Sequence, residues 1–159
     1  MDVYHDCKEL LRDLSDAGVR FLVVGAHAVS FHTEPRYTKD FDIWVDPAPA
    51  NVSRLLAALR AFGAPLSGLS AADFADPDTV FQMGVEPQRI DILMGVEGLD
   101  FEKAWRNRIR TTYGGTVVFV LSRADLIRTK RAVGRPVDLL DVQRLREAGK
   151  RPPKRRKPR

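Results

Sequence analysis

Residues 39–45 read Lys39-Asp-Phe-Asp-Ile-Trp-Val45, and this stretch decides the fold. Its aromatic and β-branched residues predict a buried strand over 41–45. Side chains two residues apart lie on the same face of a strand, so Asp40 and Asp42 project together while Phe41 and Ile43 face the core. Two carboxylates about 7 Å apart raise each other's pKa unless a cation lies between them. A hard divalent ion, above all Mg²⁺, satisfies that requirement and most often serves phosphate chemistry.

A second apolar segment precedes this strand and ends at a glycine. Residues 19–24 predict a strand, and Gly25 opens a turn into a short helix over 26–31. A glycine lets the backbone approach a ligand closely, and the free N–H groups at the start of a helix suit an anionic phosphate. The order of strand, glycine turn, short helix and Asp-x-Asp strand therefore predicts a phosphate site whose carboxylates hold the metal.

A third carboxylate, Asp91, lies between two isoleucines in the predicted strand 89–93. A site with two metal ions needs such a group, because the second ion also polarises the attacking hydroxyl. An acid in this apolar setting is costly unless it is paired or metal-bound. A salt bridge from Asp91 to Arg89 is the alternative interpretation.

The loop before the aspartates supplies two candidate cations for phosphate, Arg36 and Lys39. His27, at the glycine turn, either hydrogen-bonds phosphate or is a packed turn residue. No Cys/His cluster has zinc spacing, and residues 25–28 match neither a Walker loop nor a dinucleotide fingerprint.

Later in the chain, Lys130 lies on a predicted helix and is a further candidate cation, with a solvated helix face as the alternative. Asp138 and Asp141 are three residues apart on the last helix. They either anchor Lys130 or Arg131 or lie in solvent.

The remaining pattern predicts one α/β (α+β) domain over 1–148, with a mixed sheet of five to six strands flanked by helices. Residues 63–79 predict an irregular excursion with at most a short helix, and Gly114-Gly115 is a hairpin signal. Further helices are expected at 4–17, 52–62, 101–106, 123–133 and 136–147, the last ended by Gly149. Further strands are expected at 80–85, 110–113 and 116–121.

The composition is that of an ordinary soluble globular protein, with 159 residues, 44% hydrophobic and 30% charged. No apolar run is long enough for a membrane span, and the acidic N-terminus argues against a secretory signal. The single cysteine, Cys7, cannot form an internal disulfide and is interpreted as a partly buried helix residue. These features predict a cytoplasmic protein without a membrane partner.

The net charge of +5 belongs to the C-terminal end. Residues 150–159 carry seven Lys or Arg and no acid, so the rest of the chain is nearly neutral. A Pro-rich basic segment cannot bury apolar surface, and 149–159 is predicted to be a disordered tail. It either contacts nucleic acid through phosphates or only improves solubility.

Four segments together resemble a known family. They are Phe21–Ser30, Arg36–Val45, Arg89–Leu93 and Leu126–Asp141. Over about residues 5–147 the chain resembles the minimal nucleotidyltransferases of the DNA polymerase β superfamily, and most nearly the AbiEii/MenT-type proteins of bacterial toxin–antitoxin and phage-defence systems. The resemblance implies the nucleotidyltransferase fold and transfer of a nucleoside monophosphate from an NTP such as ATP to a hydroxyl group, with release of pyrophosphate.

The resemblance also implies roles for individual residues. Two Mg²⁺ ions, or Mn²⁺, would be held by Asp40, Asp42 and Asp91, with Lys130 as a further catalytic residue. Nucleotide-binding positions would be Gly25, Ala26, His27, Ser30, Arg36, Lys39, Asp138 and Asp141. The chain departs from the family at Ala26, where the turn usually continues with Ser or Gly, and it lacks the large helical C-terminal part of typical toxins.

The expected acceptor is an RNA 3′ end, such as that of tRNA, or a hydroxyl on a partner protein, with a cognate antitoxin or toxin as a further partner. The alternative is an antitoxin module that binds a nucleotide or partner but has lost turnover, because Ala26 removes a phosphate-binding hydroxyl. A third hypothesis is a protein that binds nucleic acid only through its basic tail. The sequence predicts neither the preferred base nor the oligomeric state.

Overall fold

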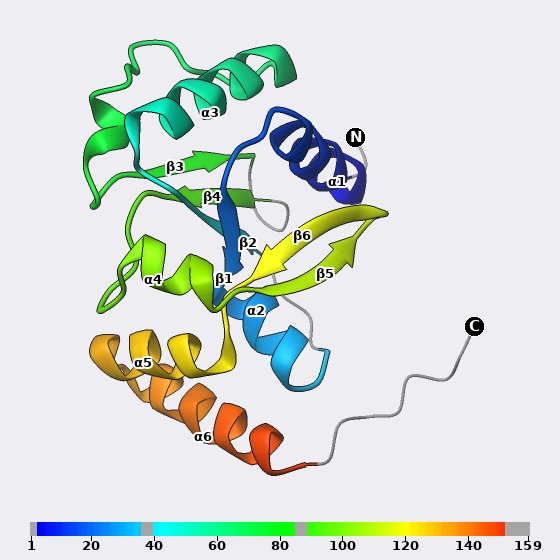
Figure 1. Cartoon of the computed structure of the whole chain (residues 1–159), viewed down its shortest axis with the longest axis vertical. Coiled ribbons are helices and arrows are strands. Elements are labelled where there is room, and N and C mark those ends of the chain that lie inside the picture. The colour runs from blue at the N-terminus through cyan, green and yellow to red at the C-terminus, as the bar shows by residue number, and fades with distance from the viewer. Residues whose placement is uncertain (1–2, 36–39, 85–88, 152–159) are drawn as a thin grey trace.

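The computed structural model describes residues 3–35, 40–84 and 89–151 (Figure 1). Its strands are β1 (Phe21–Val24), β2 (Asp40–Val45), β3 (Val80–Met83), β4 (Arg89–Leu93), β5 (Ile109–Tyr113) and β6 (Thr116–Val120). Its helices are α1 (Val3–Asp16), α2 (Gly25–His32), α3 (Pro49–Phe62), α4 (Phe101–Arg106), α5 (Arg123–Val133) and α6 (Pro136–Lys150), with a 3₁₀ turn at Asp73–Ala75.

The strands form one six-stranded mixed sheet in the order β3-β4-β2-β1-β6-β5. The central strand β1 is antiparallel to β2 and parallel to β6, while β2 is parallel to β4. The neighbours β3 and β4 are antiparallel, and so are β5 and β6, where Gly114-Gly115 predicts a hairpin. The sheet is therefore the mixed α/β architecture expected from the sequence, and it brings β2 and β4 side by side.

Helices α1 and α3 cover one side of the sheet, and α5 and α6 lie on the other (Figure 1). The leucines of α1 and α3 are buried in the same core cluster as Ile43 and Val45. Each such side chain contributes about 1.5–3 kcal/mol through burial. Cys7 belongs to this core, and burial raises the pKa of its thiol to about 12, so it is an inert packing residue.

Two caps account for the start and end of α5. The Ser122 hydroxyl accepts a hydrogen bond from the Asp125 backbone N–H, and Gly134 ends the helix in the left-handed conformation with φ +70°.

The prediction that the last helix ends near Glu147 is wrong, because α6 continues through Gly149 to Lys150. Gly149 lies against the Arg123 guanidinium, which leaves no room for a Cβ, and it keeps helical geometry. The stop signal is the proline that follows Arg151, since a residue before proline avoids the helical region. Arg151 is extended, with φ −81° and ψ 140°.

The predicted boundary between domain and tail at 148/149 therefore falls inside α6, and residues 152–159 lie outside the described part of the chain. No helix in the described ranges is both long and apolar enough to cross a membrane.

Candidate functional site

Asp40, Asp42 and Asp91 come together on one face of the sheet. In the parallel pairing of β2 with β4, Asp42 lies opposite Asp91 and Asp40 lies opposite Arg89. Paired residues on neighbouring strands point to the same face. The predicted strand over 89–93 is confirmed, and it lies beside the strand that carries the Asp-x-Asp pair.

The Arg89 guanidinium bridges two of these carboxylates. Its Nε donates to Asp91 Oδ1 at 2.9 Å, and its Nη2 donates to Asp40 Oδ2 at 3.1 Å. Asp91 therefore forms the salt bridge to Arg89 that was its alternative interpretation, and it also lies beside Asp40 and Asp42. Asp40 Oδ1 is buried and has no hydrogen-bond partner among the described residues.

Negative charge is under-compensated at this site. Burial raises the pKa of Asp42 to about 6, and the charges of Asp91 and Asp40 act in the same direction. A hydrogen bond with Asp91 also favours the protonated Asp42, while Arg89 lowers the pKa. Among the described residues, one guanidinium thus serves three carboxylates, which is the environment that attracts a further cation.

Gly25 packs directly against this group. It has φ +66°, and a Cβ at this position would collide with Asp42 Oδ2. A side chain is therefore excluded by both backbone geometry and space. The N-terminus of α2 has no side-chain cap, so its first backbone N–H groups lack the usual side-chain acceptor.

Other predicted nucleotide-binding residues of α2 lie elsewhere. The His27 ring packs on Phe41 with 4.4 Å between centroids, and burial lowers its pKa. The Ser30 hydroxyl is buried without a hydrogen-bond partner in the described ranges. Neither of them, nor Ala26, lines the cavity beside Asp42. For His27 the geometry agrees with the packed turn residue.

A cavity of about 200 Å³ lies between the sheet and helices α5 and α6. Gly25 and Asp42 line one wall, and Lys130, Arg135 and Asp138 line another. Residues far apart in the sequence thus border one open cavity.

Lys130 is held by both aspartates of α6. Its Nζ lies 3.4 Å from Asp138 Oδ1 and 3.3 Å from Asp141 Oδ2. The two carboxylates are only 2% exposed, so the prediction that they anchor Lys130 is confirmed and the solvent-exposed alternative is wrong. A hydrogen bond from Arg135 Nε, at 2.7 Å, is the main cause that lowers the pKa of Asp138.

Arg36 and Lys39 lie outside the described residues. The sequence did not identify Arg135 as a lining residue, and it identified Arg89 only as a partner of Asp91. The signal for Arg89 was its spacing, because residues two apart on a strand share a face. Its second contact, to Asp40, depends on strand register, which the sequence does not show.

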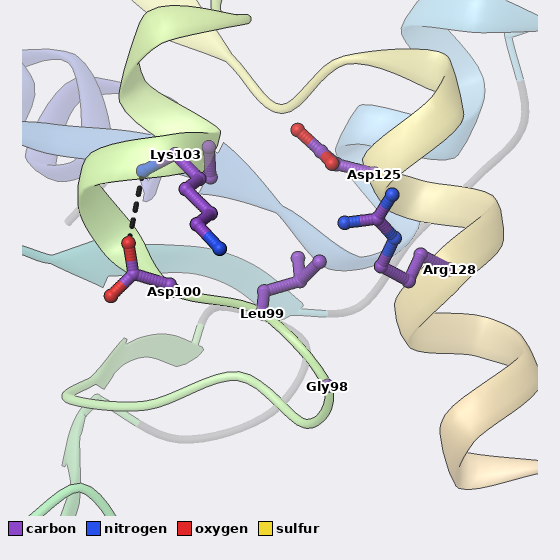
Figure 2. Close-up of a pocket in the computed structure, with 7 residues that line it drawn as sticks. Gly98, Leu99, Asp100, Lys103, Asp125 and Arg128 are labelled. Atoms are coloured by element: carbon purple, nitrogen blue, oxygen red, sulfur yellow. Dashed lines mark hydrogen bonds between the residues drawn. The ribbon is translucent and has the colours of Figure 1, made fainter.

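A second hollow, of about 400 Å³, lies between α4 and α5 (Figure 2). The side chains of Lys103 and Arg128 both point into the space beside Leu99. Asp100 caps α4 by accepting from the Lys103 backbone N–H at 3.1 Å. This hollow contains none of the predicted site residues, but it places two cations beside the segment 95–97 that lines the first cavity.

The carboxylate group is not a preformed metal site in the described part of the chain. Within 3–35, 40–84 and 89–151, no three His, Cys, Asp or Glu side chains form a ready metal cage. The Arg89 guanidinium lies between Asp40 and Asp91, where an ion would otherwise bind. The donor set is nevertheless all oxygen, and Asp40 Oδ1 lacks a partner, so these residues fit a hard divalent cation that displaces Arg89.

No model of a known protein family matches this chain, and a search of curated proteins found no match either. Its function is therefore inferred from the geometry and the sequence motifs.

Proposed function

We propose that this chain is a divalent-metal-dependent nucleotidyltransferase that moves a nucleoside monophosphate from an NTP to a hydroxyl group and releases pyrophosphate. The register of β2 and β4 is the observation that carries the proposal. It sets Asp42 opposite Asp91, with Asp40 on the same face and Gly25 against Asp42. This is the arrangement that an Asp-x-Asp pair with a third carboxylate needs in order to hold Mg²⁺ or Mn²⁺.

The carboxylates of Asp40, Asp42 and Asp91 would hold the metal. When bound, the metal would neutralise phosphate charge and lower the pKa of the attacking hydroxyl. The uncapped N-terminus of α2 supplies backbone N–H groups and the positive end of a helix dipole for the phosphates.

Lys130 and Arg135 supply positive charge from the opposite wall of the cavity. Asp138 and Asp141 are positioning residues, because they hold the Lys130 ammonium in one place. Because these charged groups are already held in place, they need to move little when negative charge develops on the transferring group.

The acceptor is proposed to be anionic, with an RNA 3′ end favoured over a hydroxyl on a partner protein. Lys103 and Arg128 lie in the neighbouring hollow and suit the phosphates of an RNA strand (Figure 2). The basic residues of 150–159 also favour an RNA acceptor, because they can contact its phosphates. A role in toxin–antitoxin or phage-defence systems is part of this proposal and rests on the family resemblance alone.

The second candidate is a binding module without turnover. It is favoured by the Arg89 guanidinium between Asp40 and Asp91, which substitutes for a metal ion, and by the missing hydroxyl at Ala26. This candidate predicts NTP binding without transfer to any acceptor.

The test incubates the protein with each α-³²P-labelled NTP, Mg²⁺, total bacterial RNA and lysate protein. The Asp40→Ala/Asp42→Ala variant should lose at least about 100-fold of the transfer rate. The matched control is Asp76→Ala/Asp78→Ala, which removes an Asp-x-Asp pair of the same spacing from an exposed loop and should keep full activity.

Label in RNA or protein that depends on Asp40 and Asp42 supports the transferase and names the acceptor class. Bound NTP without label supports the binding module. Label that persists in the Asp40→Ala/Asp42→Ala variant contradicts the proposed metal site.

A further inference from the structure

Apolar side chains are exposed where α5 ends and α6 begins. Val133, Val137, Leu139 and Leu140 are 45%, 54%, 51% and 46% exposed. Among the described residues, seven large hydrophobic side chains are exposed, and these four fall within eight consecutive positions. We call these four residues the α5–α6 patch. Such clustering differs from singly scattered surface apolar residues, which need no explanation.

The packing of α6 keeps this patch outward. The helix turns Asp138 and Asp141 inward to Lys130 and buries Val142 and Leu145 with them. A rotation that buried Leu139 and Leu140 would remove both carboxylates from their cation. The exposure is therefore built into the fold, because the charge cluster fixes the orientation of the helix.

The exposed charged residues of the stretch that carries the patch are all arginines. Between positions 128 and 144 these are Arg128, Arg131, Arg135 and Arg144. The two acids of that stretch are buried. Glu97 is an exposed acid beside Val133 and Arg135. The surface thus combines an apolar centre with a mainly positive rim, which selects a partner by charge as well as by apolar contact.

We propose that the α5–α6 patch is the docking site for an acidic amphipathic helix of a second protein. Val137 and Leu140, at i and i+3 on α6, would contact the apolar stripe of that helix. Its carboxylates would face Arg131 and Arg144. A second copy of this chain fits less well, because patch-to-patch pairing brings arginine against arginine. A membrane surface fits less well too, because the patch has no aromatic anchor and spans only two turns of helix.

Docking here would affect the cavity beside Asp42. Val133 is part of the α5–α6 patch and Arg135 lies next to it in the sequence. Both also line the cavity wall that carries Lys130. A helix seated on the patch would cover that wall and compete with the nucleotide. This consequence rests on the proposed function, whereas the docking site itself does not.

The test uses the full chain and a labelled 18-residue helical peptide with leucines at i, i+3, i+4 and i+7 and glutamates on its other positions. A peptide of the same composition, scrambled so that the leucines share no face, is the first control. Fluorescence anisotropy should show binding of the amphipathic peptide alone. The Val137→Ser/Leu140→Ser variant should weaken that binding about tenfold or more.

Val80→Ser/Ile109→Ser is the matched control variant, because both residues are exposed apolar side chains on other elements. It should bind like the unchanged protein, and Arg131→Glu should weaken binding. Equal binding of the scrambled peptide, or no effect of Val137→Ser/Leu140→Ser, overturns the proposal.

Two further measurements distinguish the acidic helix from the two other possible occupants, a second copy of this chain and a membrane surface. If sedimentation shows a dimer that Val137→Ser/Leu140→Ser dissociates, the occupant is a second copy and the proposal is wrong. Patch-dependent binding to anionic phosphatidylglycerol vesicles but not to the peptide also overturns it. Peptide binding that leaves NTP binding unchanged supports the docking site and contradicts only its link to the cavity. Failure of nucleotide transfer therefore does not affect the peptide result.

Discussion

Two charge clusters face the same cavity, the first through Asp42 and the second through Lys130, Arg135 and Asp138. They balance their charges in opposite ways. The sheet cluster consists of Asp40, Asp42, Asp91 and Arg89, and the helix cluster consists of Lys130, Arg135, Asp138, Asp141 and Arg144. In the sheet cluster three acids share one cation of the part of the chain that the structure describes. In the helix cluster two acids share three cations.

The pKa values follow this difference. Asp42 in the sheet cluster has its pKa raised to about 6, whereas the pKa of Asp138 in the helix cluster is lowered, chiefly by its hydrogen bond with Arg135. Each carboxylate of the helix cluster is paired, whereas Asp40 Oδ1 has no partner in the described part of the chain. Both clusters contain buried acids, so burial alone does not set the sheet cluster apart. Its smaller share of positive charge among the described residues does.

The largest expected effect comes from breaking the helix cluster. Asp138→Ala should lower the free energy of unfolding by about 3 kcal/mol, because Lys130 and Arg135 lose a buried partner. Urea unfolding at pH 7 measures this. Glu147→Ala removes an exposed carboxylate from the same helix and should change stability by less than about 0.5 kcal/mol. Equal effects of the two variants would show that the helix cluster is not structural.

A smaller effect of opposite sign is expected in the sheet cluster. Asp42→Asn should raise the free energy of unfolding at pH 7.5 by about 2 kcal/mol, because an uncharged isostere removes the cost of a buried, repelled carboxylate. The folded-state pKa is raised from 3.8 to about 6, so the stabilising contribution of protonated Asp42 is complete below pH 3.8 and is lost as the pH rises through about 6. The advantage of Asp42→Asn should therefore disappear on acidification below that range.

Unfolding curves from pH 3.5 to 8 measure this dependence, with Asp78→Asn in the exposed loop as the control. A loss of stability in Asp42→Asn at pH 7.5 would mean that the ionised Asp42 is well compensated. The contrast between the two clusters would then be wrong.

The sheet cluster was largely predictable from the sequence, because a strand has a period of two. That period sets Asp40 and Asp42 on one face, and the isoleucines around Asp91 identify its strand as buried. The confirmed six-stranded sheet then brings the third carboxylate beside the first two.

The helix cluster was predictable only in part. Helical spacing allowed Asp138 and Asp141 to meet Lys130, but it equally allowed a solvated face. The choice depends on how α5 and α6 pack, and an acidic residue buries there only because a cation from another helix meets it. The exposure of Leu139 and Leu140 was unpredictable for the same reason. The spacing of residues along the helix does not show that Asp138 and Asp141 take the inward positions.

The smallest expected effect concerns Arg89. It tests most directly whether the sheet cluster has less positive charge than the helix cluster. If the sheet cluster is short of positive charge, Arg89→Gln should raise its affinity for Mn²⁺ about tenfold, because the ion no longer competes with a guanidinium between Asp40 and Asp91. Isothermal titration with Mn²⁺ measures this without any turnover, and Arg110→Gln on an exposed position of β5 is the matched control. A weaker Mn²⁺ affinity in Arg89→Gln would mean that Arg89 holds the carboxylates in place for the ion. Arg89 would then belong to the metal site as a positioning residue, and its bridge between Asp40 and Asp91 would no longer favour the inactive binding module.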